Sequence, residues 1–318
     1  MKLADVPGIH AVLINIVICT HNRASLLMRT LESLNSASRP SECDIELLVI
    51  ANACTDRTVE ELDDYRQRMN REQLLPMRWA EETTTGKSYA LNHAIGLLTG
   101  ELVAFVDDDH RVDSNYLASI CRTANQYPDM TLFCGRIFPD WDGREPEWAH
   151  DKGPYAIYPL PVPRYDQGDS PREIDLEGPL AGGGNLFLRR EVFERIGKFS
   201  TAYGPQGHDL GGGEDGEFLI RALKAGERLQ YVPDVIQYHY VEPERFKLRY
   251  LLRKSYQRTR AGMRIRIDKN RLPPRYLWRK LLTNIWKVVV SFYWPKARFY
   301  LVRVAATLGE INAYLVRQ

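Results

Sequence analysis

Short apolar runs alternate with segments of helical spacing through the first third of the chain. The apolar runs, which predict strands, are 11–20, 45–50, 76–80 and 101–106. The segments with helical spacing are 23–34, 56–69 and 86–98. This alternation predicts an α/β protein whose mostly parallel sheet carries helices on both faces, and such sheets bind ligands beyond the carboxyl ends of their strands.

Polar segments follow three of these predicted strands. They read THNR at 20–23, NACTDRT at 52–58 and DDD at 107–109. Three adjacent carboxylates repel one another unless a cation or solvent offsets their charge, and Mg²⁺ or Mn²⁺ takes oxygen ligands of this kind together with phosphates. The triplet therefore fits a metal–diphosphate site or a solvated acidic turn. On an extended backbone, Asp107 and Asp109 would face one side and Asp108 the other.

The second half of the chain has two glycine clusters. One reads AGGGN at 181–185 and fits either a tight turn or a backbone wall for a sugar or an acceptor. The other precedes Glu214 and Asp215, which fit either helix capping or a catalytic carboxylate pair. A helix is predicted from about 215 to 225, followed by short strands at 228–233 and 235–240. The segment 138–180 predicts a long loop with a binding or lid role.

The net charge of +2 conceals two regions of opposite charge. Residues 245–318 hold 19 Lys and Arg against Asp268 and Glu310, a net charge of +17, whereas residues 1–244 carry −15. The five cysteines include no C-x-x-C pair and follow no signal peptide, so we expect a reducing cytosolic compartment.

The basic C-terminal extension, residues 245–318, mixes Lys and Arg with aromatic and aliphatic residues. Its charges interrupt every apolar stretch before it reaches about 18 residues, which disfavours a membrane-spanning helix. We expect an amphipathic helical segment that contacts an anionic membrane surface, peripheral at the cytoplasmic face. A cap packed on the acidic body and a dimer interface are the alternatives, and no motif supports nucleic-acid binding.

Six blocks in order resemble the inverting family-2 glycosyltransferases, which have the GT-A nucleotide-sugar-binding fold. The blocks are ICTHNR, IANACTDRT, GKSYALNHAIGLLTGELVAFVDDD, AGGGNLFLRREVFERIGKF, GEDGEFLIRALKAGERLQYVPD and YHY. The resemblance covers roughly residues 11–240. It implies a catalytic domain at 1–244, with a nucleotide-sugar half at about 1–112 and an acceptor half at about 113–244, followed by the extension.

The resemblance also implies roles for individual residues. Asp215 matches the catalytic base and Glu214 its acidic neighbour, while Asp109 and His239 match positions that reach the metal. The matching positions around the nucleotide are Thr20, Asn22, Arg23, Asn52, Asp56, Lys87, Asn92, Asp107 and Asp108. Gly183, Gly184 and Asn185 are the expected acceptor-binding residues. Ala51 stands where the family often has a carboxylate.

These observations predict a Mg²⁺- or Mn²⁺-dependent transferase that uses a nucleotide-diphosphate sugar, with UDP as the expected nucleotide. The expected acceptor is a glycan or a lipid-linked molecule. Carboxylates at strand ends would also serve a Mg²⁺-dependent nucleotidyltransferase or phosphohydrolase, and the nucleotide pocket alone would serve a non-catalytic binding module.

Overall fold

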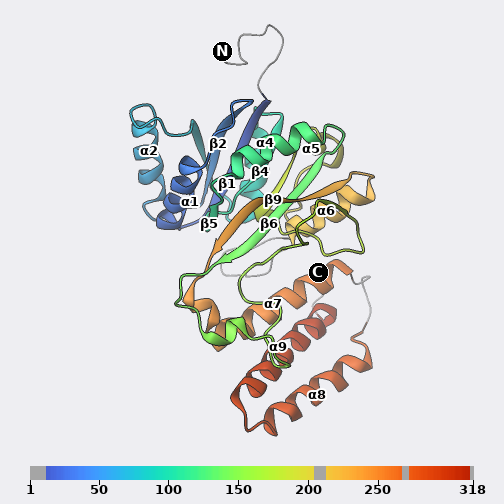
Figure 1. Ribbon diagram of the computed structural model, residues 1–318. Helices are drawn as coiled ribbons and strands as arrows, with labels where there is room; N and C mark the ends of the chain where they lie inside the picture. Colours follow the sequence, from blue (N-terminus) through green and yellow to red (C-terminus); the bar gives the residue numbers. More distant parts are fainter. Residues whose placement is uncertain (1–11, 204–212, 267–271, 316–318) are drawn as a thin grey trace. The chain divides into compact units, whose positions relative to one another are not determined.

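The computed structural model describes residues 12–203, 213–266 and 272–315 (Figure 1). Residue 11 of the first predicted strand, residues 267–271 and 316–318 of the extension, and two of the three glycines before Glu214 lie outside these residues. The chain divides into two compact units. The first unit comprises Met1–Asp140, Arg164–Ala202 and Glu214–Tyr240, and the second comprises Trp141–Pro163, Tyr203–Gly213 and Val241–Gln318.

A nine-stranded mixed sheet forms the first unit, in the order β3-β2-β1-β4-β8-β6-β9-β5, with β7 paired to β9. The strands are β1 Val12–Thr20, β2 Cys43–Asn52, β3 Met77–Glu82, β4 Leu102–Phe105, β5 His110–Val112, β6 Leu132–Asp140, β7 Arg172–Ile174, β8 Leu186–Arg189 and β9 Leu229–Tyr240. The pairs β1–β2, β1–β4 and β2–β3 are parallel, and β8 is antiparallel to both β4 and β6. The predicted mostly parallel α/β sheet is confirmed in this half.

Helices cover both faces of this sheet, as predicted. In the first unit they are α1 Ala24–Ser36, α2 Thr58–Arg68, α3 Lys87–Leu97, α4 Tyr116–Gln126, α5 Val192–Ile196, α6 Glu214–Lys224 and the 3₁₀ turn η3 Gly183–Asn185. Alternate residues of β1 separate the two layers: Ile16 packs in the same core as α1, α2 and α4, and Val17 packs with α3, α5 and α6. Both faces of the sheet are therefore buried, which explains the continuous apolar runs in the sequence.

The two short strands predicted at 228–233 and 235–240 are one continuous strand, β9. Pro233 suggested a break because proline donates no hydrogen bond to a sheet. The parallel pairing of β9 with β6 shifts register between Cys134 and Arg136, opposite this part of β9. The irregularity accommodates the proline, so that the strand continues to His239 and Tyr240.

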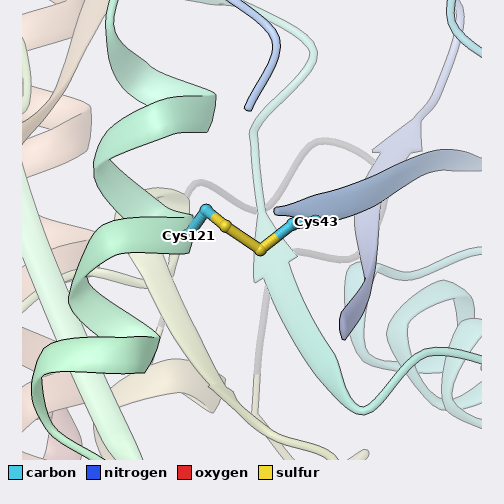
Figure 2. The surroundings of a disulfide bond; sticks show 2 residues. All are labelled: Cys43 and Cys121. Atoms are coloured by element: carbon cyan, nitrogen blue, oxygen red, sulfur yellow. A yellow bond between two sulfur atoms is a disulfide. The ribbon is translucent and has the colours of Figure 1, made fainter. Parts of the chain in front are cut away.

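A disulfide joins Cys43, at the start of β2, to Cys121 in α4 (Figure 2). Their Cα atoms lie 6.2 Å apart across a sequence separation of 78 residues, and both residues are buried. The expectation of a reducing compartment did not anticipate this bond, because such a separation belongs to no local cysteine motif. The other cysteines, Cys19, Cys54 and Cys134, are free.

The second unit is helical, as predicted for the basic extension. It contains η2 Glu147–His150, η4 Pro243–Phe246, α7 Leu248–Arg266, α8 Arg275–Val289 and α9 Trp294–Leu315. Leu277 and Leu281 of α8 pack with Ile311 of α9, and Lys280 forms an ion pair with Glu310 at 2.8 Å. A Cβ atom on Gly309 would lie 2.2 Å from the Tyr256 carbonyl oxygen, so glycine permits the close approach of α9 to α7.

Part of the predicted binding loop belongs to this second unit. Trp148 packs with Phe246, and the Arg298 guanidinium lies 4.0 Å from the centre of the Trp148 ring. The Tyr155 ring lies 6.0 Å from that of Phe299 in α9. Residues 141–163 therefore form one body with the C-terminal helices. Within the described ranges, none of the helices combines the length and the apolar character that crossing a bilayer requires.

Candidate active site

The three aspartates lie in a turn beyond the end of β4. This strand ends at Phe105, and the His110 amide donates to the Asp107 carbonyl at 3.0 Å to close the turn. Lys87 Nζ contacts Asp107 at 2.6 Å, whereas Arg23 contacts Asp108 at 3.1 Å and Asp109 at 3.0 Å. Asp107 Oδ2 and Asp109 Oδ1 each lie 3.9 Å from His110 Nε2, so these two carboxylates face the same histidine although the backbone turns here.

Lys87, at the start of α3, links Asp107 to the carboxylate pair of α6. Its Nζ atom lies 4.0 Å from Glu214 Oε1. Burial opposes the charged form of Lys87, but the charges of Asp107 and Glu214 outweigh it and raise the pKa of this ammonium. Burial also opposes ionisation of Asp107, and the Lys87 charge overcomes it, so the pKa of Asp107 lies below its ordinary value. This salt bridge therefore keeps both partners ionised.

Two other carboxyl groups have raised pKa values. Burial, reinforced by the neighbouring Asp215 charge, raises the pKa of Glu214 to about 7. Burial and the Asp109 charge raise the pKa of Asp108 to about 6, although Arg23 opposes the shift. The site thus holds carboxyl groups whose protonation differs near neutral pH, which is common where proton transfer or cation binding takes place.

Asp109, His110 and His239 form a buried group that can hold a metal ion, with candidate ligand atoms within 4.8 Å of one another. Strand β5 is antiparallel to β9, and this register places His110 opposite His239. His239 Nδ1 lies 2.6 Å from the Tyr240 carbonyl oxygen, which can only accept, so Nδ1 carries the hydrogen. His239 Nε2 lies 3.5 Å from Asp109 Oδ2.

Gln237 determines the tautomer of His110. The Gln237 amide nitrogen lies 3.1 Å from both the Phe105 carbonyl oxygen and Asn185 Oδ1, so its Oε1 atom faces His110. His110 Nδ1 lies 2.5 Å from that oxygen and must donate to it. The buried Nε2 atom of His110 has no hydrogen-bond partner among the described residues. Two imidazole nitrogens and one carboxylate therefore fit a divalent cation, and the Gln237 contact orients one of them.

The two glycines of η3, Gly183 and Gly184, let this segment approach the carboxylates closely. A Cβ atom on Gly184 would lie 2.7 Å from both Asp107 Oδ2 and His110 Cε1. The Gly183 amide donates to Asp215 Oδ2 at 2.5 Å. Any larger residue at 184 would displace the metal-binding group. Asn185 is buried, and its amide nitrogen donates to the carbonyl oxygens of Arg136 and Val235.

The residues predicted around the nucleotide occupy the ends of β1 and β2. Asn22 accepts hydrogen bonds from the amides of Thr55 and Asp56, and Asp56 in turn accepts from the Ala24 and Thr58 amides. These contacts join the two strand-end loops. Thr20, the last residue of β1, is buried beside them.

Two predicted asparagines support the backbone around this region. Asn52 accepts from the Gly86 amide at 2.8 Å and donates to the Glu82 and Thr84 carbonyls. Asn92 exchanges two hydrogen bonds with the backbone of Phe199, at 2.8 and 2.9 Å. The side-chain amides of both residues therefore hold neighbouring segments in place.

The structure brings Lys87, Asp107, Glu214 and Asp215 together around one narrow pocket of the first unit. Asp109 and His239 are joined by His110 and Gln237, which the sequence analysis missed. Two signals were present in the sequence: His110 directly follows the aspartates, and Gln237 shares a strand face with His239 two residues later.

A family model described as glycosyl transferase family 2 matches residues 15–197, more than half of the chain. Among curated proteins, the chain is 25% identical to the glucosyl-dolichyl phosphate glucuronosyltransferase of Haloferax volcanii, over 69% of this chain and 66% of that protein. It is 22% identical to the succinoglycan biosynthesis protein ExoM of Rhizobium meliloti, over 80% and 76% of the two chains.

Solved structures share the fold. The mannosyltransferase PcManGT of Pyrobaculum calidifontis, in complex with GDP-Man and Mn²⁺, superposes with a TM-score of 0.58 at 19% identity, over 93% of this chain and 86% of that one. S. aureus TarS 1–349 with UDP-GlcNAc gives 0.53 at 13% identity, over 95% and 90%. The match covers 39% of a longer TarS chain. The sheet and its helices have the GT-A architecture, and the chain belongs to glycosyl transferase family 2.

Proposed function

We propose that this protein is an inverting, cation-dependent glycosyltransferase. It would move a sugar from a nucleoside-diphosphate donor to a hydroxyl group of a glycan or lipid-linked acceptor. The observation that carries the proposal is the position of the 107–110 turn, which lies between a candidate cation-binding group and a pocket lined by carboxylates. The turn joins Asp109, His110 and His239 to the pocket that holds Lys87 and Asp215. Sugar transfer needs a positive charge beside the leaving diphosphate and a base beside the attacking hydroxyl, and these two groups of residues would supply them next to each other.

Asp109, His110 and His239 would hold the cation. Two of these three donors are imidazole nitrogens, which suit a transition-metal ion such as Mn²⁺ better than Mg²⁺. When bound, the cation supplies positive charge that offsets the charge developing on the leaving diphosphate. The Mn²⁺ present with GDP-Man in the PcManGT complex supports this assignment.

Thr20, Asn22, Arg23, Asn52 and Asp56 are proposed to shape the nucleoside end of the donor site, since they lie at the carboxyl ends of β1 and β2. Arg23 and Lys87 would contribute positive charge towards the phosphates. TarS binds UDP and PcManGT binds GDP-Man. A UDP-sugar is our first candidate donor.

Asp215 is the proposed catalytic base. Its carboxylate would accept the proton of the acceptor hydroxyl as that oxygen bonds to the anomeric carbon of the sugar. The bond between this carbon and the diphosphate oxygen breaks, and its electron pair leaves with the nucleotide. Attack from the opposite face inverts the anomeric configuration. Gly183 donates to Asp215 and would form the wall on which the acceptor lies, while the buried Gly184 and Asn185 would support that wall from behind.

The extension is the proposed membrane-contacting part of the protein. Residues 141–163, from the predicted acceptor half, share the second unit with residues 241–318. If the acceptor is embedded at the cytoplasmic face of a membrane, this arrangement would place the membrane-contacting segment and the acceptor-recognising segment in the same compact unit. The named function of the Haloferax volcanii relative, which acts on a dolichyl phosphate, supports a lipid-linked acceptor.

A donor screen followed by product analysis tests the proposal. Calorimetry with UDP, GDP and their sugars, each with Mn²⁺, with Mg²⁺ and with EDTA, should identify one nucleotide whose binding requires the cation. Nuclear magnetic resonance of the product should then show the inverted anomeric carbon. Retention of configuration would exclude the single displacement. Release of pyrophosphate would indicate a nucleotidyltransferase, and donor binding without turnover of any acceptor would indicate a binding module.

A further inference from the structure

Helix α8 carries two apolar faces. One face, which includes Leu277 and Leu281, packs against α9 in the core of the second unit. A helix at the surface of a water-exposed protein needs only one such face. The second face therefore requires a partner other than the helices of this unit.

The second face is a continuous stripe at helical spacing. Trp278, Leu282, Ile285, Trp286 and Val289 follow one another at intervals of four, three, one and three residues. Their exposed fractions range from 42% for Ile285 to 69% for Val289. Phe292, in the turn after α8, is fully exposed. We call these six residues the α8 apolar face.

Basic residues border this face, and acidic residues are absent from the surrounding sequence. Arg275 and Arg279 lie three residues before Trp278 and Leu282 respectively, and so are their neighbours on the helix surface. Lys287 and Lys296 lie nearby in the sequence, and no Asp or Glu occurs from 269 to 309. Glu310, the first acidic residue after this stretch, forms an ion pair with Lys280.

We propose that the α8 apolar face inserts into the interface of an anionic lipid bilayer, with α8 lying parallel to the membrane plane. Tryptophan and phenylalanine suit the headgroup and upper acyl region, and the bordering arginines suit anionic headgroups. Helix α8 is too charged and too short to span the hydrocarbon core, so its apolar face lies on the membrane rather than across it. Charge favours the bilayer over a second copy of this chain, since a two-fold contact would bring the same basic residues together.

This inference names the membrane-binding residues of the function proposed above, but it does not depend on sugar transfer. Binding to vesicles requires no donor and no acceptor. A chain that binds vesicles without transferring sugar would support the docking face and overturn the enzymatic proposal. A chain that transfers sugar to a water-soluble acceptor and ignores vesicles would do the reverse.

Flotation of the full-length protein with vesicles tests the docking face. One set of vesicles contains phosphatidylcholine alone, and the other contains about 30% phosphatidylglycerol, an amount that gives an anionic surface. The parent should float with the anionic vesicles, and its tryptophan emission should shift to the blue. The double variant Trp286→Ser/Phe292→Ser should bind the anionic vesicles at least about tenfold more weakly than the parent, because it loses two large apolar side chains from the interface.

A matched control replaces exposed apolar residues outside the face. Tyr158→Ser/Leu176→Ser removes side chains that are 91% and 45% exposed, and it should bind vesicles as the parent does. Thermal unfolding and nucleotide binding should be the same for both double variants and the parent, which shows that each is folded. Equal vesicle binding by the parent and the Trp286→Ser/Phe292→Ser variant would overturn the proposal. So would a parent dimer in sedimentation that this variant dissociates, since the face would then join two copies.

Discussion

His110 Nδ1 donates a hydrogen bond of 2.5 Å to Gln237 Oε1, and this contact turns the other ring nitrogen of His110 towards Asp109. The two residues lie on neighbouring antiparallel strands, β5 and β9. A second partner that fixes the tautomer is a common feature of histidine ligands to metals. We therefore treat His110 as a ligand and Gln237 as the residue that positions it.

We predict that His110→Asn weakens Mn²⁺ binding by at least about 10–100-fold, the loss seen when only a residue that orients a ligand is replaced. Calorimetry without donor measures the affinity. Pulsed electron paramagnetic resonance of bound Mn²⁺ should lose the coupling to one imidazole nitrogen. His150→Asn is the control, since His150 is half exposed and lies in the second unit. Unchanged affinity and nitrogen coupling in His110→Asn would remove His110 from the metal site.

The Asp215→Asn variant should lower kcat by about 10²–10⁴-fold, the usual contribution of a general base. Asparagine keeps the size of the side chain and can still accept from the Gly183 amide. Donor affinity should therefore stay near that of the parent in calorimetry. Asp234→Asn, in an exposed part of β9, provides a control with the same chemical change. A normal kcat in Asp215→Asn would exclude this residue as the base.

The first four strands of the sheet were predictable because each is marked by its own short apolar run in the sequence. The alternation of apolar runs with helical segments predicted β1 to β4 and α1 to α3, and the polar strand ends predicted which edge carries the candidate site. Local periodicity did not predict the turn at Asp107–Asp109, although Asp107 and Asp109 still face the same ring nitrogen of His110. It also failed at Pro233, because residues 232–235 of β9 stand opposite the single residue Gly135 of β6, and this pairing of distant strands cannot be read from local sequence.

Contacts between distant segments were beyond the reach of sequence patterns. The His110–Gln237 hydrogen bond depends on the register of β5 with β9, which are 127 residues apart at this pair. Asn52 bonds to Gly86 in the loop before α3, and Asn185 bonds to the backbone of β6 and β9, so both depend on segments distant in sequence. These polar side chains belong to no recognisable sequence motif, so only their partners in the folded structure distinguish them from surface residues.

The Lys87→Met variant should lose stability, because Asp107 and Glu214 would lose the charge that offsets their burial. Removal of one partner from a fully buried ion pair costs about 3–5 kcal/mol, and we expect about 1–3 kcal/mol here because Lys87 and Asp107 keep 27% and 30% of their side-chain surface exposed. Urea unfolding without added cation measures this loss.

Arg57→Met is the control for Lys87→Met. The Arg57–Glu60 ion pair is 74% and 72% exposed, so the substitution should leave the free energy of unfolding close to that of the parent. An equally small effect of Lys87→Met would mean that solvent, rather than Lys87, offsets the charges of the carboxylates.

Glu214→Gln should stabilise the protein at alkaline pH. The folded-state pKa of Glu214 is about 7, above its ordinary value of 4.5. The folded state therefore retains this proton more strongly than the unfolded state, and the associated stability is present below about pH 4.5 and lost as the pH rises through 7. In EDTA, the variant should be more stable than the parent at pH 8 by on the order of 1–3 kcal/mol and nearly equal at pH 4.5. A constant difference across this range would contradict the raised pKa.

Reduction of the Cys43–Cys121 disulfide should lower the free energy of unfolding by about 2–4 kcal/mol, since the bond closes a long loop in the unfolded chain. Peptide mapping without reductant should recover the two cysteines in one linked fragment. The Cys43→Ser/Cys121→Ser variant should unfold at lower urea concentration than the parent and should no longer respond to dithiothreitol. Cys54→Ser, which removes a free thiol, should keep the parent's response. Recovery of Cys43 and Cys121 as free thiols from protein prepared under oxidising conditions would contradict the bond. Under those conditions, two adjacent sulfur atoms would have formed the disulfide.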